Sequence, residues 1–232
     1  TGGLLLLLVV TEVRKRVRLL LSKDATVRES HHRVKNNLQT ISSLLQLQAR
    51  RSRNEEARYA IAESVRRIGS IALVHETLSR EAGEEVAFTE ILRPLVQMVA
   101  EAVTSSERRI EFQVSGDAGK LPAQIATPMA VVLTELLQNT ADHAFPTDVP
   151  RTEPARVRVD LDHDDGGVTI RVVDNGVGVP DGFSVANASG LGLSIVRALV
   201  TSDLGGTIDV FEPPEGPGTV VELRIPMESV AS

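Results

Sequence analysis

The first third of the chain carries apolar residues at alternating four- and three-residue steps. This spacing is typical of the buried seam of a coiled coil or helix bundle. The positions on the repeat are Val27, His31, Val34, Leu38, Ile41, Leu45 and Gln48. No glycine or proline interrupts residues 12–53, so we expect a single helix of roughly forty residues, about 60 Å long.

A second helix is expected to follow the first. Asn54 is placed to cap it, with acidic residues near its positive end. Its apolar stripe runs from Ile61 to Leu78, and the helical pattern stops near Gly83. Two antiparallel helices with one stripe each cannot bury those stripes as an isolated pair. We therefore predict a homodimer in which two hairpins form a four-helix bundle.

Leu4–Val10 is an uninterrupted apolar run near the start of the sequence. It is too short to cross a bilayer, which takes roughly 20 residues as a helix, and it lacks the charged flank and cleavage site of a signal peptide. We interpret it as a buried strand, the last strand of an upstream domain whose remnant spans residues 1–12. The alternative is the inner end of a membrane helix.

Beyond Gly83 the pattern changes to short elements of both kinds. Helices are expected at residues 89–103, 122–144 and 190–202. Strands are expected at residues 86–88, 109–114, 156–163, 168–174, 207–211 and 219–226, with a hairpin turn at residues 164–167. The predicted fold class is α+β: a helical hairpin over residues 13–83, then an α/β sandwich over residues 84–232 with helices on one face of a mixed sheet.

Composition narrows the possible chemistry. The chain of 232 residues has no cysteine, 3% aromatic residues and a formal net charge of -6. The lack of cysteine excludes disulfides and thiolate metal sites, and it agrees with a reducing compartment such as the cytoplasm. The negative charge argues against direct nucleic-acid binding, and we expect no membrane insertion from these residues.

His31 and His32 are adjacent in the first long helix. His31 lies on the seam, whereas His32 lies about 100° around the helix from it, between basic residues and within reach of a partner. Neutral imidazole is nucleophilic near neutral pH. Taken alone, the pair is an ordinary feature of a basic helix. A nucleotide site in the second domain would make His32 a candidate phosphoryl acceptor.

Two segments of the second domain carry side chains suited to a nucleotide. Glu135 and Asn139 share a helix face, and their oxygens are hard ligands suited to Mg²⁺. Asp174 ends an apolar strand, where its carboxylate can accept a hydrogen bond from the exocyclic amine of adenine. Gly176 and Gly178 then allow a positive φ and close approach of a flat ring. A solvated helix face and a turn explain the same residues.

A third segment, Ser189-Gly190-Leu191-Gly192-Leu193, opens an amphipathic helix. Free backbone N–H groups and the helix dipole favour phosphate oxygens there, although helix capping alone would also explain the glycines. The segment is not a Rossmann fingerprint, because no strand directly precedes it and a third glycine is missing. It also lacks the Gly-Lys-Ser/Thr of a P-loop.

The order and spacing of the three segments resemble the N, G1 and G2 boxes of the GHKL ATPase superfamily, which includes histidine kinases, gyrase, Hsp90 and MutL. The stretch His31-His32-Arg33-Val34-Lys35-Asn36-Asn37-Leu38 is similar to that of sensor histidine kinases of the HisKA_2 type. The likeness runs from about Lys23 to Pro226 and points to the actinobacterial PdtaS-like group, in which a PAS domain precedes the kinase core.

This resemblance implies a kinase that uses ATP and Mg²⁺ to autophosphorylate a histidine. It then passes the phosphoryl group to an aspartate in the receiver domain of a separate response regulator, which the likeness suggests is of the ANTAR type. It implies that His32 is the acceptor, that Asn139 holds Mg²⁺ beside Glu135, and that Asp174 reads adenine. The other nucleotide-binding positions that it implies are His143, Gly176, Gly178, Gly190, Leu191, Gly192, Leu193 and Thr219, with an ATP lid at residues 181–189.

Two positions depart from the family pattern. Asp142 stands where a basic phosphate contact is expected, which puts that contact in doubt. Arg33 stands where many histidine kinases carry an acid that accepts the proton of the phosphoacceptor, and Glu29, three residues before His32, is the substitute candidate. Asn36, one turn after His32, suits equally a role in orienting water for dephosphorylation of a partner and a plain surface position.

Two other functions remain open. A nucleotide-binding dimeric scaffold, or pseudokinase without phosphotransfer, would explain Asp142 and the missing acid. A GHKL serine kinase or ATPase would leave the long hairpin that carries His32 without a purpose.

Overall fold

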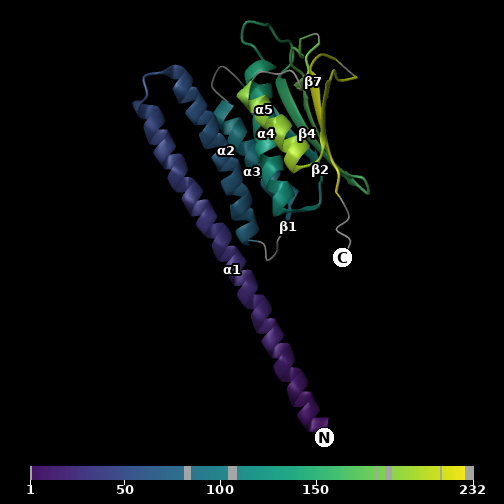
Figure 1. The fold of residues 1–232 in the computed structure, drawn as a ribbon. Helices are drawn as coiled ribbons and strands as arrows, with labels where there is room; N and C mark the ends of the chain where they lie inside the picture. The colour runs from purple at the N-terminus through teal and green to yellow at the C-terminus, as the bar shows by residue number, and fades with distance from the viewer. Residues whose placement is uncertain are drawn as a thin grey trace.

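Two long antiparallel helices stand beside a domain of helices and sheet (Figure 1). The computed structural model describes residues 2–80, 85–103, 109–180, 182–185, 190–214 and 216–227, without the side chains of residues 2–25 and 28. Helix α1 spans Gly2–Arg51 and α2 spans Glu55–Arg80. Asn54 caps α2 as predicted, since its Oδ1 accepts the backbone N–H of Glu56 at 2.8 Å and that of Ala57 at 3.2 Å.

The predicted strand at Leu4–Val10 is wrong, because these residues belong to α1. A helix pairs its backbone groups internally, whereas a lone strand would leave them unpaired. Leucine is also a good helix former, and nothing after Gly3 breaks the helix before Arg51. Within the described part of the chain, no helix has both the length and the hydropathy needed to cross a membrane.

The rest of the chain forms an α/β sandwich, which confirms the predicted fold class. The main sheet has the strand order β2-β4-β5-β7-β6, in which β2 and β4 are parallel and the other neighbours are antiparallel. Its strands are β2 (Ile110–Gly116), β4 (Ala155–Asp164), β5 (Gly167–Asp174), β6 (Thr207–Phe211) and β7 (Thr219–Ile225). One face is covered by α3 (Phe88–Val103), α4 (Ala123–His143) and α5 (Leu191–Ala198) (Figure 1).

Two details differ from the prediction. A short antiparallel pair joins β1 (Glu85–Ala87) to β3 (Lys120–Pro122), and β3 is too short to show an alternating pattern in the sequence. The last helix ends at Ala198 and continues as a π-helical turn, η2 (Leu199–Asp203). Neither change affects the order of the predicted elements.

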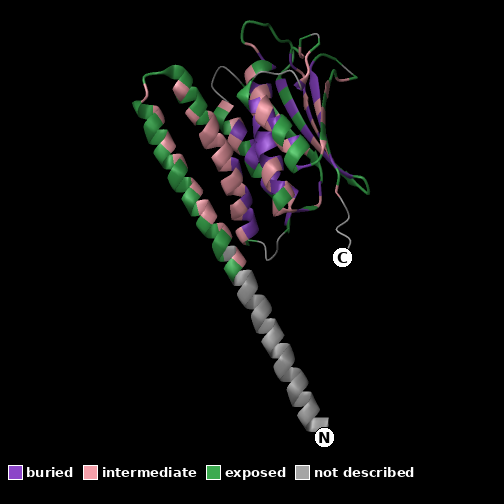
Figure 2. Cartoon of the chain, in the orientation of Figure 1, coloured by how far each residue is buried: buried purple, intermediate pink, exposed green. Residues whose placement is uncertain are grey.

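Helix α4 lies at the centre of the domain. Every residue from Met129 to Leu137 is buried, because α2, α3, α5 and the sheet pack around the helix (Figure 2). A helix enclosed in this way is expected to be apolar on all sides. Glu135 is the one charged residue in this stretch, and a carboxylate is rarely buried without a partner.

Candidate functional site

The two adjacent histidines of α1 face different surroundings. His31 Nδ1 lies 2.8 Å from Nδ1 of His75 on α2, so one ring donates a hydrogen bond to the other. Burial, and then the neighbouring His31, lower the pKa of His75, which favours its neutral form. The prediction that His31 faces the seam is therefore confirmed.

His32 points away from the seam and is exposed. Asn36 Nδ2 donates to His32 Nδ1 at 3.3 Å, which leaves Nε2 of the ring open to a partner. Glu29 does not pair with His32 here, because its Oε1 accepts both Nε and Nη2 of Arg33, at 3.1 and 2.6 Å. Arg33, which stands where many histidine kinases carry an acid, therefore binds Glu29, the candidate that would take the role of that acid.

Glu135 and Asn139 of α4 lie against Gly192, in the glycine-containing segment that opens α5. A Cβ added to Gly192 would lie 2.5 Å from Glu135 Oε2 and 3.9 Å from Asn139 Nδ2. Only glycine lets the first turn of α5 pack this closely on α4. The structure thus brings together the first and third segments that the sequence analysis singled out, although more than fifty residues separate them.

Arg67, which no sequence pattern singled out, donates hydrogen bonds to both carboxylate oxygens of Glu135. Its Nε donates to Oε1 at 2.7 Å and its Nη2 donates to Oε2 at 3.0 Å. Both side chains are largely buried, with 13% and 7% of their surfaces exposed. The hydrogen bond to Glu135 raises the pKa of Arg67. No local pattern in α2 distinguishes this arginine from its neighbours.

Asp174 lies buried where β5 ends and β7 begins. Its Oδ1 accepts the backbone N–H of Gly176 at 2.7 Å, and the backbone and hydroxyl of Thr219, its partner in the strand register, also donate to it. Burial raises the pKa of Asp174, and these donors oppose the shift. The structure therefore places Thr219 beside Asp174.

The two glycines after Asp174 have different roles. Gly178 has a φ of +79°, as expected. Gly176 has no positive φ, so that part of the prediction is wrong. Glycine is needed there because a Cβ would lie 2.3 Å from the carbonyl oxygen of Ala144. The neighbouring N–H of Val177 donates to this oxygen at 3.0 Å, which joins the loop to the end of α4.

The remaining predicted positions surround this end of the domain. Gly190 precedes α5 in an extended conformation, with its carbonyl accepting the N–H of Ser194 at 3.0 Å. Leu191 is exposed, whereas Leu193 packs against the core. His143 is exposed at the last residue of α4. Much of the predicted lid, residues 181 and 186–189, lies outside the described residues.

Asp142 is turned toward other protein groups. Its Oδ2 accepts from Gln138 Nε2 at 2.9 Å and from the hydroxyl of Tyr59, on α2, at 3.4 Å. Burial, followed by the charge of Asp142, raises the pKa of Tyr59. The acid at the position expected to be basic therefore takes part in the contact between the hairpin and α4.

Comparisons with known proteins agree with this arrangement. The HisKA_2 model, described as a histidine kinase, matches residues 29–103. The HATPase_c model, described as a histidine kinase-, DNA gyrase B- and HSP90-like ATPase, matches residues 124–229. The histidine kinase domain of a blue-light activated histidine kinase from Erythrobacter litoralis superposes with a TM-score of 0.62 at 25% identity, over 88% of this chain and 94% of that domain.

Curated relatives are more similar in sequence. The sensor histidine kinase PdtaS of Mycolicibacterium smegmatis is 46% identical over 226 residues, and that of Mycobacterium tuberculosis is 44% identical over 226 residues. Each match covers 97% of this chain and 44% of the relative, so the chain spans less than half of their length. With its helical segment and its ATPase-like domain both matched, the chain belongs to the histidine kinase family.

Proposed function

We propose that the chain is the kinase core of a two-component sensor. It transfers the γ-phosphoryl group of ATP to His32 and then to an aspartate of a separate response regulator. The observation that carries the proposal is the meeting of Glu135, Asn139 and Gly192 at one point of the α/β domain, in a chain whose helical hairpin carries an exposed histidine. We expect the receiver partner to be of the ANTAR type and the reaction to take place in the cytoplasm.

The donor set suits a magnesium nucleotide. Among the described residues, Asn139 Nδ2 is buried without a hydrogen-bond partner, so it can donate to a phosphate oxygen, and Gly192 leaves the space beside it free of a side chain. A carboxylate and an amide are groups that bind Mg²⁺, whose remaining ligands come from water and phosphate. We assign Asn139 to the metal and Glu135 to its waters. When bound, the ion neutralises charge that develops on the transferred phosphoryl group.

The adenine end is assigned to Asp174. Its carboxylate accepts a hydrogen bond from the amine at C6 of adenine, where guanine carries a carbonyl oxygen, while Thr219 and Gly176 hold the carboxylate in place. The phosphates lie toward the N-terminus of α5, where Gly190, Leu191, Gly192 and Leu193 offer backbone N–H groups. We assign His143 and Gly178 to the same nucleotide site.

The transfer step has a defined proton balance. Nε2 can attack phosphorus only in the tautomer that carries the ring proton on Nδ1, so the hydrogen bond from Asn36 Nδ2 to Nδ1 has to open first. The proton on Nδ1 then leaves the ring as the bond from Nε2 to phosphorus forms. The bond from the γ-phosphorus to its bridging oxygen breaks, and ADP departs. Glu29 accepts this proton after its own hydrogen bonds to Arg33 have broken. Once Nδ1 has lost its proton, Asn36 Nδ2 can donate to it again, and Asn36 is also placed to orient water.

Incubation with γ-labelled ATP and Mg²⁺ tests the proposal. We expect label that is acid-labile and base-stable, as phosphohistidine is, and that moves to a receiver domain added afterwards. ATP labelled at the α-phosphate is the control and should leave no label. Nucleotide binding without label would contradict the proposal and favour the scaffold.

We also propose that the hairpin forms a homodimer. Ile41, Leu44 and Leu47 of α1 are 46%, 58% and 47% exposed, and no described side chain of α1 is fully buried. One hairpin therefore leaves much of its apolar surface in water, and a second copy would cover it as a four-helix bundle.

The variant Leu44→Glu is expected to dissociate this dimer, because it places a charge in the centre of the apolar surface. Sedimentation equilibrium should then give a mass near 25.0 kDa, in place of twice that value. Gln46→Glu adds the same charge about 200° around the helix, and should remain dimeric. A monomeric wild-type chain, or a dimer that Leu44→Glu leaves intact, would exclude this interface.

A further inference from the structure

The contact between Arg67 and Glu135 links the helical hairpin to the proposed nucleotide site. Arg67 belongs to α2, whereas Glu135 belongs to α4 and lies against Gly192. Both carboxylate oxygens accept from the guanidinium. In this arrangement a guanidinium already lies on both of the oxygens through which Glu135 would hold the waters of a metal ion.

Some buried polar groups in the surrounding contact between α2 and α4 lack a hydrogen-bond partner among the described residues. Among the described residues, three buried side-chain atoms have no hydrogen-bond partner: Arg66 Nη2, Gln138 Oε1 and Asn139 Nδ2. All three belong to these two helices, on residues next to Arg67 or within four residues of Glu135. Buried polar groups are usually hydrogen-bonded in a permanent interface. The interface between α2 and α4 is therefore suited to exchange its hydrogen-bond partners.

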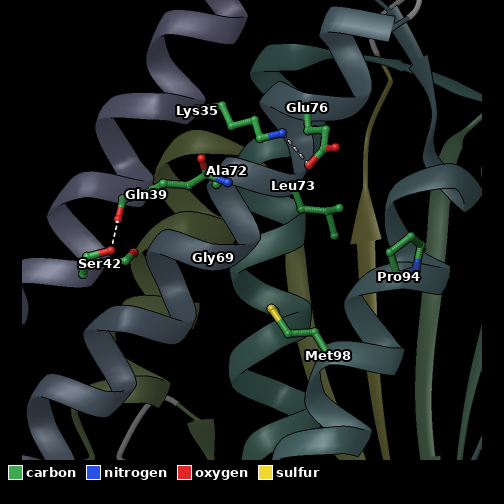
Figure 3. Close-up of a pocket in the computed structure, with 10 residues that line it drawn as sticks. Lys35, Gln39, Ser42, Gly69, Ala72, Leu73, Glu76, Pro94 and Met98 are labelled. Atoms are coloured by element: carbon green, nitrogen blue, oxygen red, sulfur yellow. Dashed lines mark hydrogen bonds and ion pairs between the residues drawn. The ribbon is translucent and has the colours of Figure 1, made fainter. Parts of the chain in front are cut away.

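A groove of about 630 Å³, open to solvent, lies among α1, α2 and α3 (Figure 3). Lys35 of α1 pairs with Glu76 of α2 at 3.1 Å in its wall, while Met98 and Pro94 line it from α3. Val74 and Leu78 of α2 are nevertheless fully buried in the core cluster, so the hairpin also has an apolar contact with the α/β domain. The polar contacts that are suited to exchange partners are those around Arg67.

The contact between Arg67 and Glu135 lies at a different position along the hairpin axis from His32. His31 pairs with His75, so the adjacent His32 lies at nearly the same level as residue 75 of α2. Arg67 is eight residues earlier on α2, a separation of about 12 Å along the helix axis. A phosphate bound beside Glu135 would be offset from His32 by about this distance. The domain has to move along the hairpin before transfer.

We propose that Arg67 masks Glu135, and that the docked hairpin and a magnesium nucleotide compete for this carboxylate. The inference rests on the proposed nucleotide site. In the masked state Arg67 supplies the positive partner that buried Glu135 needs. When metal and nucleotide bind, the metal takes over that role, Arg67 is released, and the domain can move to His32. Arg67 is thus a positioning residue that acts through Glu135.

Competition predicts that removing the guanidinium strengthens nucleotide binding. We expect Arg67→Gln to bind Mg-ADP about tenfold more tightly than the wild type by calorimetry, within the range of typical coupling energies. Arg67→Lys keeps the charge but can satisfy only one oxygen well, so its affinity should fall between the two. Arg58→Gln, an exposed arginine of the same helix, is the matched control and should leave affinity unchanged.

Magnesium dependence separates masking from a merely structural role. With EDTA in place of Mg²⁺, the gain in ADP affinity of Arg67→Gln should disappear, because the metal is the competitor. Weaker Mg-ADP binding by both Arg67 variants would instead identify Arg67 as a phosphate contact and overturn masking, as would unchanged affinity. If Arg67→Gln does not fold, Arg67→Lys decides by the same criteria. If no variant and no wild type binds Mg-ADP, the nucleotide site itself fails.

Discussion

Replacing His32 with glutamine is expected to abolish phosphorylation of the chain by ATP. The imidazole of His32 is exposed, and its Nε2 is open to a partner, whereas glutamine offers no comparable nucleophile. Loss of a covalent nucleophile lowers rates by more than about 1,000-fold. The measurement is acid-labile label from γ-labelled ATP, counted per chain at fixed time.

His31→Gln is the matched control for this experiment. His31 is adjacent in sequence but lies against His75, where a glutamine amide can still form a hydrogen bond. It should retain most of the label. Nucleotide affinity should be unchanged in both variants, because neither histidine belongs to the proposed nucleotide site. Equal labelling of the two variants would exclude His32 as the acceptor.

The second large effect is expected at Asp174. Asp174→Asn keeps the size of the side chain but presents an amide in place of a carboxylate, which weakens acceptance from the adenine amine. A hydrogen bond to a charged group contributes about 1.5–3 kcal/mol, so ADP should bind roughly 10- to 100-fold more weakly. Calorimetry with ADP and GDP measures both the affinity and the preference for adenine.

Asp165→Asn makes the same acid-to-amide change in the hairpin turn between β4 and β5, and should not alter ADP binding. Acidification provides a second check. Burial raises the pKa of Asp174, so its charge is lost at a higher pH than that of an exposed aspartate. Adenine affinity should therefore fall as the pH is lowered through that raised pKa, and Asp174→Asn should remove this dependence. An unchanged preference for ADP over GDP in Asp174→Asn would contradict the assignment.

Local patterns predict most of the fold. Helix periodicity and the cap at Asn54 define the hairpin, because these signals depend on neighbouring residues alone. The same is true of the strands and of the three nucleotide segments. The secondary structure of Leu4–Val10 is harder to predict, since a short apolar run fits a buried strand and a helix equally well. Its neighbours in α1, rather than its composition, determine the result.

The missing parts of the site depend on tertiary contacts. Arg67 and Glu135 are 68 residues apart, and an arginine in the middle of a helix carries no sign of its partner. Gly176 looked like a turn glycine, yet its requirement comes from the carbonyl of Ala144 at the end of another helix. A sequence pattern reports what a residue is suited to do, and only the packing shows which group it meets.

The join between Gly176, Val177 and Ala144 has a consequence for how the molecule senses its ligand. This contact joins the loop after Asp174, the proposed adenine site, to the end of α4, so a base bound there would move together with that helix. If the hairpin separates from α4, the surroundings of the phosphates would change while the contacts to the base would stay. In the proposed site, ADP would therefore remain bound through its purine whether the hairpin and the α/β domain are docked or apart.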